Sequence, residues 1–438
     1  FRLIKRYTSP DLFQFPCRTG KILDFMVYPA IIKIHMFLIG VKEDFIMPEY
    51  TAWITAQIRK ICETYKNRTA GSVSVRDCMH TMKAQLRDWC DDIAAEPFTL
   101  HPHAFMGSAP LQASLCICGV ICFLLSYFLS SAATAWISAV LFLAAISVWL
   151  LEYVFYGRAF DFLFPKKESV NIYAERKARV ESRQRIILCG HADAAFEMSF
   201  FVHLKAWMIY VLMVGADLGM FVCLLFGVLY AVGAVSVHTA AIFSVIEAAL
   251  LLFYIPWLFF ICWRVVADGA NDNLTGCFIG MSILKEMAEK DERLDYTDVC
   301  CLITDGEESG LRGAMAFAEA HRQALIDDHT MVIAIDTIHD PDELMIYHRG
   351  INFTQKNSPE VCELLHKAGL ACGKNIPYTD FYPGANDSEA FSRNGIKAAA
   401  ICAVQHTPST YYHTRYDSWD NLRPDCIELV RNIARRAL

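Results

Sequence analysis

The chain has 438 residues, of which 55% are hydrophobic and 20% are charged, and its formal net charge at pH 7 is -7. This length exceeds one average domain, and the hydrophobic fraction is too high for an ordinary soluble enzyme. No basic patch with interleaved aromatic residues occurs, which excludes nucleic acid as an expected partner.

The N-terminal region, residues 1–110, is predicted to contain helices and the start of a catalytic domain. Residues 1–20 are polar and interrupted by prolines, which does not fit a cleavable signal segment. Residues 23–41 are apolar but include charged residues and a proline. This composition favours a packed or interfacial segment over a membrane span.

Two long stretches account for the excess of apolar residues. Residues 104–151 contain no charged residue, and residues 206–263 contain only Asp217 and Glu247. A bilayer core requires about 20 apolar residues per helix, so each stretch is long enough for a helical hairpin. Buried core helices are the alternative, but such long uncharged runs exceed typical globular helices. We expect four transmembrane helices at residues 111–130, 135–153, 206–229 and 238–263, within hairpin segments 111–157 and 205–264.

The remaining segments, 158–204 and 265–438, are predicted to form one catalytic domain in two parts. Short apolar runs typical of buried parallel strands lie at residues 185–190, 299–304 and 331–335. Helical spacing occurs at residues 275–290, 310–325, 359–370 and 424–438. The alternation predicts an α/β fold with a twisted, mainly parallel (mixed) sheet and helices on both faces.

Histidine and acidic side chains follow the ends of the predicted strands and recur elsewhere in the catalytic domain. The short sequences are His191-Ala-Asp193, Asn271-Asp272-Asn273, Glu307-Glu308, Ile335-Asp336 and Tyr412-His413. In open α/β sheets, ligands bind beyond the carboxyl ends of the strands. Imidazole nitrogens and carboxylate oxygens bind zinc, and one carboxylate that spans two ions completes a two-metal site. The set therefore predicts a two-metal hydrolase.

With these motifs in this order, the chain resembles the di-zinc aminopeptidases and glutamate carboxypeptidases, which use co-catalytic zinc. The resemblance includes Asn67-Arg68 before a helical segment and Asp387-Ser388 before another. It covers most of residues 67–104, 158–203 and 265–438. The second hairpin departs from the family pattern, because the ligands on either side of it lie much closer in sequence in soluble members. The resemblance implies a zinc-peptidase-like fold with two zinc ions as cofactors.

The resemblance also assigns the metal ligands. Asp272 is expected to bridge both ions. The expected terminal ligands are His191 and Asp336 for one ion, and Glu308 and His413 for the other.

Three further residues receive roles from the resemblance. Glu307 is expected to act as the general base, because its neighbour binds metal while its own carboxylate reaches the attacking water. Asp193 is expected to orient His191 and raise its basicity as a ligand. Tyr382 lies near the position of an oxyanion-stabilising tyrosine of the family, at a different offset.

Positive charge is distributed unequally around the two hairpins. The predicted tips, residues 130–134 and 231–237, contain no Lys or Arg. The flanks on the catalytic side contain Arg158, Lys166, Lys167, Lys205 and Arg264. The positive-inside bias therefore predicts a multi-pass membrane protein with its catalytic domain in the cytoplasm. Seventeen cysteines without a compact spacing framework agree with a reducing compartment.

The combined interpretation is a membrane-integral zinc exopeptidase, an aminopeptidase rather than a carboxypeptidase, with peptides as substrates and the lipid bilayer as a partner. One alternative is a glutaminyl-cyclase-like aminoacyltransferase with a single zinc ion. A second is a non-catalytic membrane receptor, although such a protein is expected to lack some of the ligands. A third is a transporter, suggested by Asp217 and Glu247. Those carboxyls are expected either to be protonated and hydrogen-bonded within the helix bundle or to line a polar path to the catalytic domain.

Overall fold

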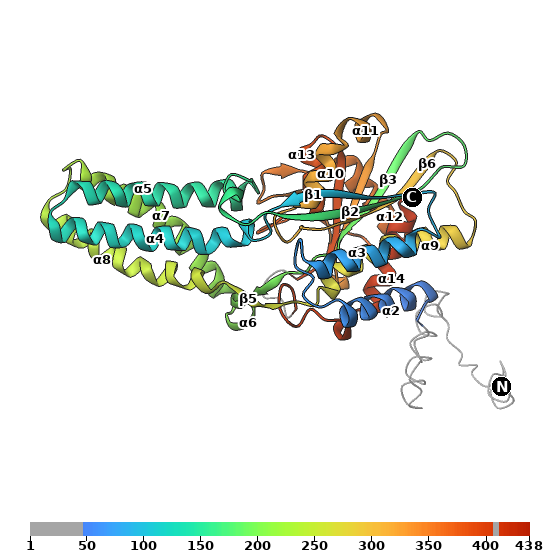
Figure 1. Cartoon of the computed structure of the whole chain (residues 1–438), viewed down its shortest axis with the longest axis horizontal. Coiled ribbons are helices and arrows are strands. Elements are labelled where there is room, and N and C mark those ends of the chain that lie inside the picture. The colour runs from blue at the N-terminus through green and yellow to red at the C-terminus, as the bar shows by residue number, and fades with distance from the viewer. Residues whose placement is uncertain (1–46, 406–410) are drawn as a thin grey trace, which may run out of the picture. The chain divides into compact units, whose positions relative to one another are not determined.

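A mixed sheet forms the centre of the computed structural model, which describes residues 47–405 and 411–438 (Figure 1). Its strands are β1 Asp92–Leu100, β2 Lys167–Arg176, β3 Gln184–His191, β6 Thr297–Thr304, β7 Met331–Ile338, β8 Leu344–Gly350, β9 Gln355–Lys356, β10 Tyr378–Asp380 and β11 Lys397–Ala403. The strand order is β1-β2-β6-β3-β7-β11-β8-β10, and β9 pairs with β8. The four central strands, β6, β3, β7 and β11, run parallel to one another. The pairs β1–β2, β2–β6 and β8–β11 are antiparallel. The predicted mixed α/β sheet is confirmed, with its parallel part at the centre.

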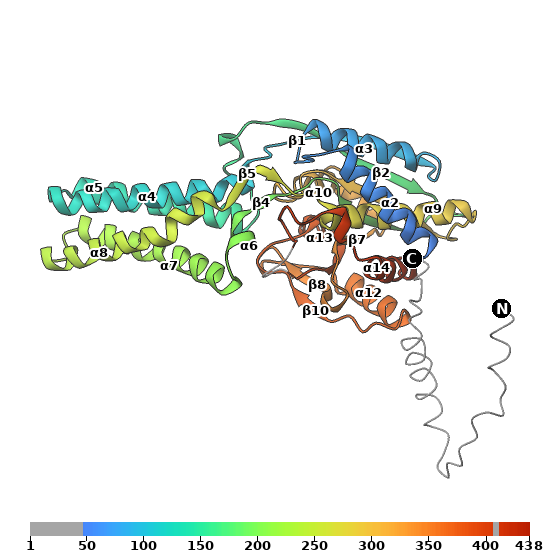
Figure 2. The same ribbon diagram turned by 90° about the horizontal axis from the view of Figure 1, so that it is seen from below.

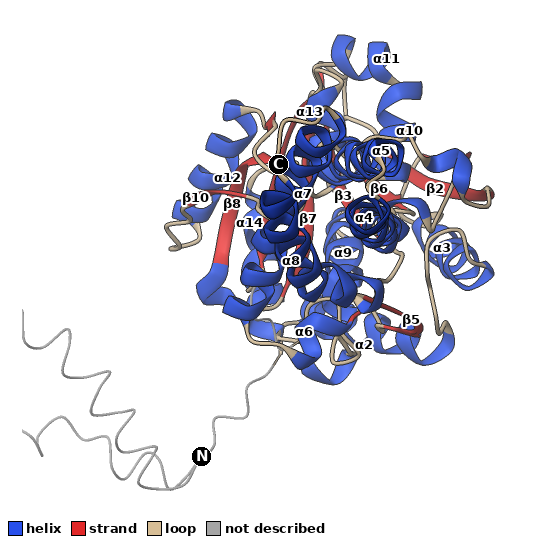
Figure 3. Ribbon diagram, turned by 90° about the vertical axis from the view of Figure 1, so that its left-hand side faces the viewer, coloured by secondary structure: helices blue, strands red, loops and turns tan. Residues whose placement is uncertain are grey.

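Alternating side chains on the central strands explain why helices cover both faces of the sheet. In β3, Ile186 and Leu188 belong to one buried cluster, whereas Ile187 and Cys189 belong to another. The first cluster is formed with α2 Glu49–Thr64, α3 Val73–Leu86, α9 Thr275–Glu289, α12 Pro359–Ala371 and α14 Pro424–Arg436. The second is formed with α10 Arg312–Ala320, α11 Arg322–Asp327 and α13 Asp387–Arg393. Figure 3 shows these helices around the strands.

Most of the predicted catalytic-domain elements are present. The predicted strands correspond to β3, β6 and β7, and three of the predicted helices correspond to α9, α12 and α14. The predicted continuous helix at residues 310–325 is wrong in two respects. Gly310 and Leu311 have positive φ angles, so α10 begins only at Arg312. At His321 the backbone leaves the helical region, with φ -107° and ψ 10°, and separates α10 from α11.

Four helices of the described residues are long and apolar enough to cross a membrane. They are α4 Ala104–Leu129, α5 Ala132–Val148 with its π-helical continuation η3 Trp149–Val154, α7 Ala206–Ala231, and α8 Val237–Tyr254 with its 3-10 continuation η5 Ile255–Phe259. The helices run side by side away from the sheet (Figures 1 and 2). They share a buried apolar core of their own.

The predicted ends of these spans differ from the observed ends at two places. Helix α4 begins at Ala104, before the predicted position 111, because the uncharged stretch is helical from its start. The last span was predicted to reach residue 263, but α8 ends near Pro256, which cannot donate a helical hydrogen bond. The chain then forms β5 Ile261–Val266, which pairs with β4 Phe196–Met198. The remaining short elements are η4 Asp161–Leu163, α6 Ser199–His203, η6 Ala270–Leu274, η7 Pro341–Glu343 and η8 Trp419–Asn421.

The two acids of the second hairpin have different environments. Glu247 on α8 is completely buried, and neither of its carboxylate oxygens has a hydrogen-bond partner among the described residues. The predicted hydrogen-bonded carboxyl is therefore wrong for Glu247 within the part of the chain that the structure describes. Asp217 on α7 lines a cavity that reaches the catalytic domain. Of these two acids, only Asp217 lies on a path of the kind predicted toward the catalytic domain.

Candidate metal centre

Four of the candidate site residues lie at or beyond the carboxyl ends of neighbouring parallel strands. His191 is the last residue of β3, and Asp336 lies near the end of β7. Glu307 and Glu308 follow the end of β6 after two intervening residues. Because β3 pairs in parallel with both β6 and β7, these side chains emerge at the same edge of the sheet.

Asp272 faces two histidines with its two carboxylate oxygens. Asp272 lies in η6 before α9, and His413 lies in the segment between β11 and α14. Oδ1 of Asp272 lies 3.2 Å from Nε2 of His191, and Oδ2 lies 3.0 Å from Nε2 of His413. Nε2 of His191 is also 3.7 Å from Oδ1 of Asp336, and Nε2 of His413 is 3.3 Å from Oε2 of Glu308. The five residues therefore form two groups that share Asp272.

Each group places three possible ligand atoms within 4.8 Å of one another. The first group contains His191, Asp272 and Asp336, and the second contains Asp272, Glu308 and His413. These are the two ligand sets that the sequence predicts, and their role as ligands stays a prediction.

Both groups contain buried polar atoms that lack a hydrogen-bond partner, and these atoms show whether the residues suit a metal. Nε2 of His191, Oδ2 of Asp272 and both carboxylate oxygens of Glu308 are buried without a hydrogen-bond partner among the described residues. Such atoms are costly to bury unless another group compensates them. A divalent cation would do so, and a set of imidazole nitrogens and carboxylate oxygens is suited to zinc. The residues present therefore fit zinc, and Asp272 belongs to both groups.

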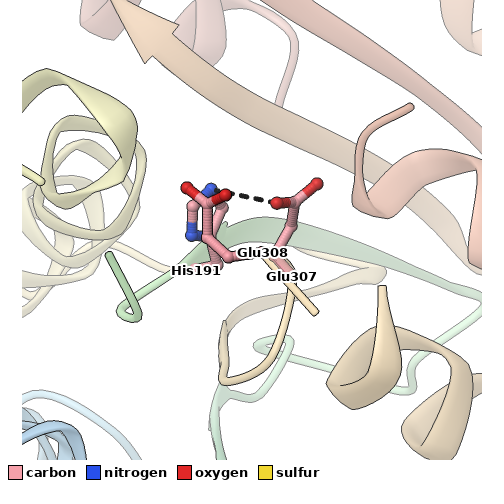
Figure 4. Close-up of side chains that lie close together, drawn as sticks. All are labelled: His191, Glu307 and Glu308. Atoms are coloured by element: carbon pink, nitrogen blue, oxygen red, sulfur yellow. Dashed lines mark ion pairs between the residues drawn. The ribbon is translucent and has the colours of Figure 1, made fainter. Parts of the chain in front are cut away.

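Glu307 lies beside the first group and also lines the adjoining cavity. Its Oε2 is 3.9 Å from Nε2 of His191, and Figure 4 shows its carboxylate turned toward that histidine. Its side chain is 12% exposed, whereas the side chain of His191 is 1% exposed. Glu307 can therefore reach both a group at the metal centre and a molecule in the cavity.

Asp193 connects His191 with the turn that carries the two glutamates. Its Oδ1 lies 3.4 Å from Nδ1 of His191, and its backbone carbonyl oxygen lies 3.2 Å from the same nitrogen, so its predicted orienting role stays a prediction. Its carboxylate oxygens also accept hydrogen bonds from the backbone N–H groups of Glu307, at 3.3 Å, and Glu308, at 3.1 Å. The sequence did not predict these two bonds. One buried carboxylate thus fixes the relative position of the histidine and the turn after β6.

Asp417 holds the segment that carries Asp272. Its carboxylate accepts hydrogen bonds from the backbone N–H of Asn271 at 2.8 Å, from Nδ2 of Asn271 at 2.9 Å and from the backbone N–H of Asp272 at 3.2 Å. Burial raises the pKa of Asp417 to about 7, with a further contribution from Asp272 and an opposing one from these hydrogen bonds. The sequence analysis missed this role. The signal that could have revealed it is the position of Asp417 four residues after His413.

Arg68 links the loop after β3 to the loop before η6. It is 1% exposed and donates hydrogen bonds to the carbonyl oxygens of Ala192 at 3.2 Å, Asp268 at 2.6 Å and Gly269 at 3.2 Å. A guanidinium suits this position because it offers several donors in one rigid plane. Ala192 adjoins His191, and Gly269 precedes Asp272 by three residues. The contacts of Arg68 therefore set the distance between two predicted ligands.

Carboxylates outnumber positive groups at the centre, and the pKa values reflect this excess. Burial raises the pKa of Glu307 and Glu308 well above the usual value, and neighbouring carboxylates add to the increase against the opposing effect of His191. Burial lowers the pKa of His191, but the nearby carboxylates of Asp193, Asp272 and Asp336 raise it well above the usual value overall. The excess of negative charge favours cations at this site.

A cavity of about 170 Å³ adjoins the two groups and extends between the apolar helices. Glu307, Glu308 and His413 line its end at the metal centre. Other parts of its wall come from α4, η3, α7 and η5. Both predicted membrane hairpins therefore contribute to the space in front of the candidate catalytic groups.

Tyr382 lies outside this arrangement. Its side chain is 42% exposed, and its ring stacks on Phe353 with centroids 4.6 Å apart. It does not belong to the lining of the cavity, although Pro383 and Gly384 do. Among the described residues, no contact of Tyr382 supports the predicted oxyanion role.

The comparisons with known proteins agree with the geometry of the centre. Residues 258–438 match the model of peptidase family M28. This family comprises co-catalytic zinc peptidases, so the match confirms the resemblance predicted from the sequence. The matched M28 segment contains Asp272, Glu307, Glu308, Asp336 and His413. His191 and Asp193 lie before it.

Solved structures similar to this chain include peptidases and cyclases. An aminopeptidase from Aneurinibacillus sp. strain AM-1 is 12% identical, with a TM-score of 0.52, and the match covers 88% of this chain and 92% of that one. BSAP, a zinc aminopeptidase from Bacillus subtilis, is 11% identical with a TM-score of 0.51, and the match covers 89% and 95% of the two chains. A glutaminyl cyclase from Fimbriiglobus ruber is 12% identical with a TM-score of 0.52, and the match covers 91% and 97%. These likenesses establish the fold. A search of curated proteins gave no match.

Proposed function

We propose that the chain is a membrane-integral zinc aminopeptidase that removes the N-terminal residue of peptides. The observation that carries this proposal is the position of Asp272, whose two carboxylate oxygens each face a separate histidine and a separate acid. Glu307 beside the shared site supports a role as general base. The proposed ligands are His191, Asp272 and Asp336 for one zinc ion, and Asp272, Glu308 and His413 for the other.

The chemistry that zinc supplies when bound is Lewis acidity, which acidifies a coordinated water and polarises a carbonyl group. Glu307 accepts a proton from the attacking water at its carboxylate and delivers that proton to the leaving amine. Asp193 keeps the Glu307 backbone and the His191 ring in fixed positions during the reaction.

Hydrolysis of aminoacyl nitroanilides by the purified, detergent-solubilised chain is the expected result that tests this function. Elemental analysis is expected to give two zinc ions per chain. Treatment with a zinc chelator should abolish hydrolysis, and added zinc should restore it, because zinc supplies the Lewis acidity that activates the water. N-acetylation of the substrate should prevent cleavage.

The glutaminyl cyclase reaction is the second candidate, because the cyclase and peptidase structures match this chain with equal or nearly equal TM-scores. One zinc ion per chain, together with cyclisation of N-terminal glutamine and no nitroanilide hydrolysis, would replace the peptidase proposal with that function. Cleavage of N-acetylated peptides at their C-terminus would indicate a carboxypeptidase instead.

We also propose that the four apolar helices span a bilayer and that the catalytic domain lies in the cytoplasm. The support is the length and apolarity of the helices and the positive charge of their flanks at the catalytic end. The test uses single reporter cysteines in a background depleted of exposed thiols. Ala234→Cys, at an exposed hairpin tip, should react with an impermeant thiol reagent in intact cells, whereas Glu181→Cys, in an exposed catalytic-domain loop, should react only after permeabilisation. The reverse pattern would place the catalytic domain outside.

A further inference from the structure

Asp217 is the acid of the cavity lining that the proposed chemistry does not use. The cavity is lined by Asp217, Glu307 and Glu308 among its acidic residues, and the two glutamates belong to the metal centre. Asp217 makes no hydrogen bond or ion pair with any residue that the structure describes. An acid within an apolar membrane helix is costly and marks a functional position by default. Within the described part of the chain, this carboxylate is therefore available to a bound molecule.

The position of Asp217 on α7 directs its carboxylate into the cavity. The α7 residues that line the cavity are Ile209, Tyr210, Met213, Ala216 and Asp217, which share one helical face. Side chains on a helix lean toward its N-terminus. The N-terminus of α7 follows β4 and α6, and Met198 of β4 donates a backbone hydrogen bond of 2.9 Å to the carbonyl oxygen of His413. Asp217 thus leans toward the catalytic-domain end of α7 and lines the same cavity as Glu307, Glu308 and His413.

The walls between Asp217 and the metal centre are mainly aromatic and aliphatic. Trp149 and Tyr153 of η3, Trp257 of η5 and Phe105 of α4 line the cavity. Such walls bury the methylene groups of a long side chain, and aromatic faces attract cations. Apart from His413, the described lining contains no basic residue. The cavity therefore combines an apolar passage with a net negative charge.

We propose that this cavity binds the side chain of the residue released by cleavage, and that Asp217 selects lysine or arginine there. This inference rests on the proposed aminopeptidase function. The aliphatic stem of the side chain contacts the aromatic wall, and the terminal cation pairs with the Asp217 carboxylate. The volume of about 170 Å³ suffices for such a side chain, since a cavity of about 150 Å³ holds a benzene molecule.

The unpaired carboxylate distinguishes a cationic side chain from an apolar one of the same length. A norleucine side chain would fill the passage but would leave the partly buried Asp217 without a partner. Leaving a charged group without its hydrogen-bond partner is costly. A site built to bind a polar group of the substrate therefore rejects a substrate analogue without that group. Lysine satisfies the carboxylate and the apolar wall together.

The test measures kcat/KM of the zinc-loaded, full-length chain with lysyl, arginyl and norleucyl nitroanilides. The wild-type chain is expected to prefer the lysyl over the norleucyl substrate by about 100-fold, the size of a hydrogen-bonded charge pair. Asp217→Asn is expected to reduce this ratio to about 1, because the amide keeps the shape but removes the charge. Equilibrium binding of lysinamide and norleucinamide should show the same preference and the same loss.

Glu247→Gln is the matched control, because Glu247 is the other acid of the same hairpin and does not line the cavity. It should leave both the lysyl-to-norleucyl ratio and the zinc content unchanged. Hydrolysis without a lysyl preference, or an Asp217→Asn chain that keeps the wild-type ratio, overturns this inference alone. Absence of hydrolysis with every substrate by a zinc-loaded chain overturns the proposed function, and equal binding of the two amides then overturns the selection by Asp217 as well.

Discussion

Replacement of Glu307 with glutamine is expected to lower kcat/KM by roughly 10² to 10⁴, the contribution of a positioned general base. The amide has nearly the same size as the carboxylate but cannot accept the proton of the attacking water. Zinc content should stay at the wild-type value, because Glu307 is not among the proposed ligands. Nitroanilide kinetics and elemental analysis of the same preparation measure both quantities.

Glu181→Gln is the control for this substitution, because it makes the same chemical change at an exposed loop position. It should have wild-type activity. A Glu307→Gln chain with nearly full activity would show that another group accepts the proton. Loss of zinc from the same variant would show instead that Glu307 is itself a ligand.

Asp272→Asn is expected to reduce both zinc content and turnover. A neutral amide offers one oxygen where the carboxylate offers two, so it cannot bridge two cations. Zinc content should fall from two ions to one or fewer per chain, and kcat/KM should fall by about 10³-fold or more, because metal ions contribute several kcal/mol of charge stabilisation.

Asp268→Asn provides the control from the same loop. Its side chain pairs with Lys66 at 2.9 Å near the surface and takes no part in the proposed centre. This variant should keep two zinc ions and wild-type turnover. If Asp272→Asn also kept both, the shared carboxylate would not be the bridging ligand.

The parallel centre of the sheet could be predicted because its strands are continuous apolar runs buried on both sides. Strands β3, β6 and β7 have this pattern, and each is followed by polar residues of the site. Strand β1 could not be predicted in the same way. Its sequence contains Asp92, Glu96 and Pro97, and its stability comes from pairing with β2, which lies far along the chain. Pairing between distant segments leaves no local pattern in the sequence.

The members of the candidate site could be predicted from motif order, but the contacts that position them could not. Residue type identifies His191 and Asp272 as possible ligands. The hydrogen bonds of Arg68 and Asp417 depend on loops that meet only in the folded chain. The cavity could not be predicted from the sequence either, because its walls combine residues of both hairpins and of the candidate metal centre. The four long apolar helices were predictable, because their apolar length is visible in the sequence.

The position of the second hairpin between His191 and Asp272 has a consequence for biosynthesis. Translation produces β3 and His191 first, then the two apolar helices, and only afterwards Asp272, which both groups of ligands share. His413, which one group needs, is made near the end of the chain. Neither group can therefore be complete before the second pair of apolar helices has been synthesised. The proposed metal centre therefore assembles only after both apolar helices of the second hairpin have been made.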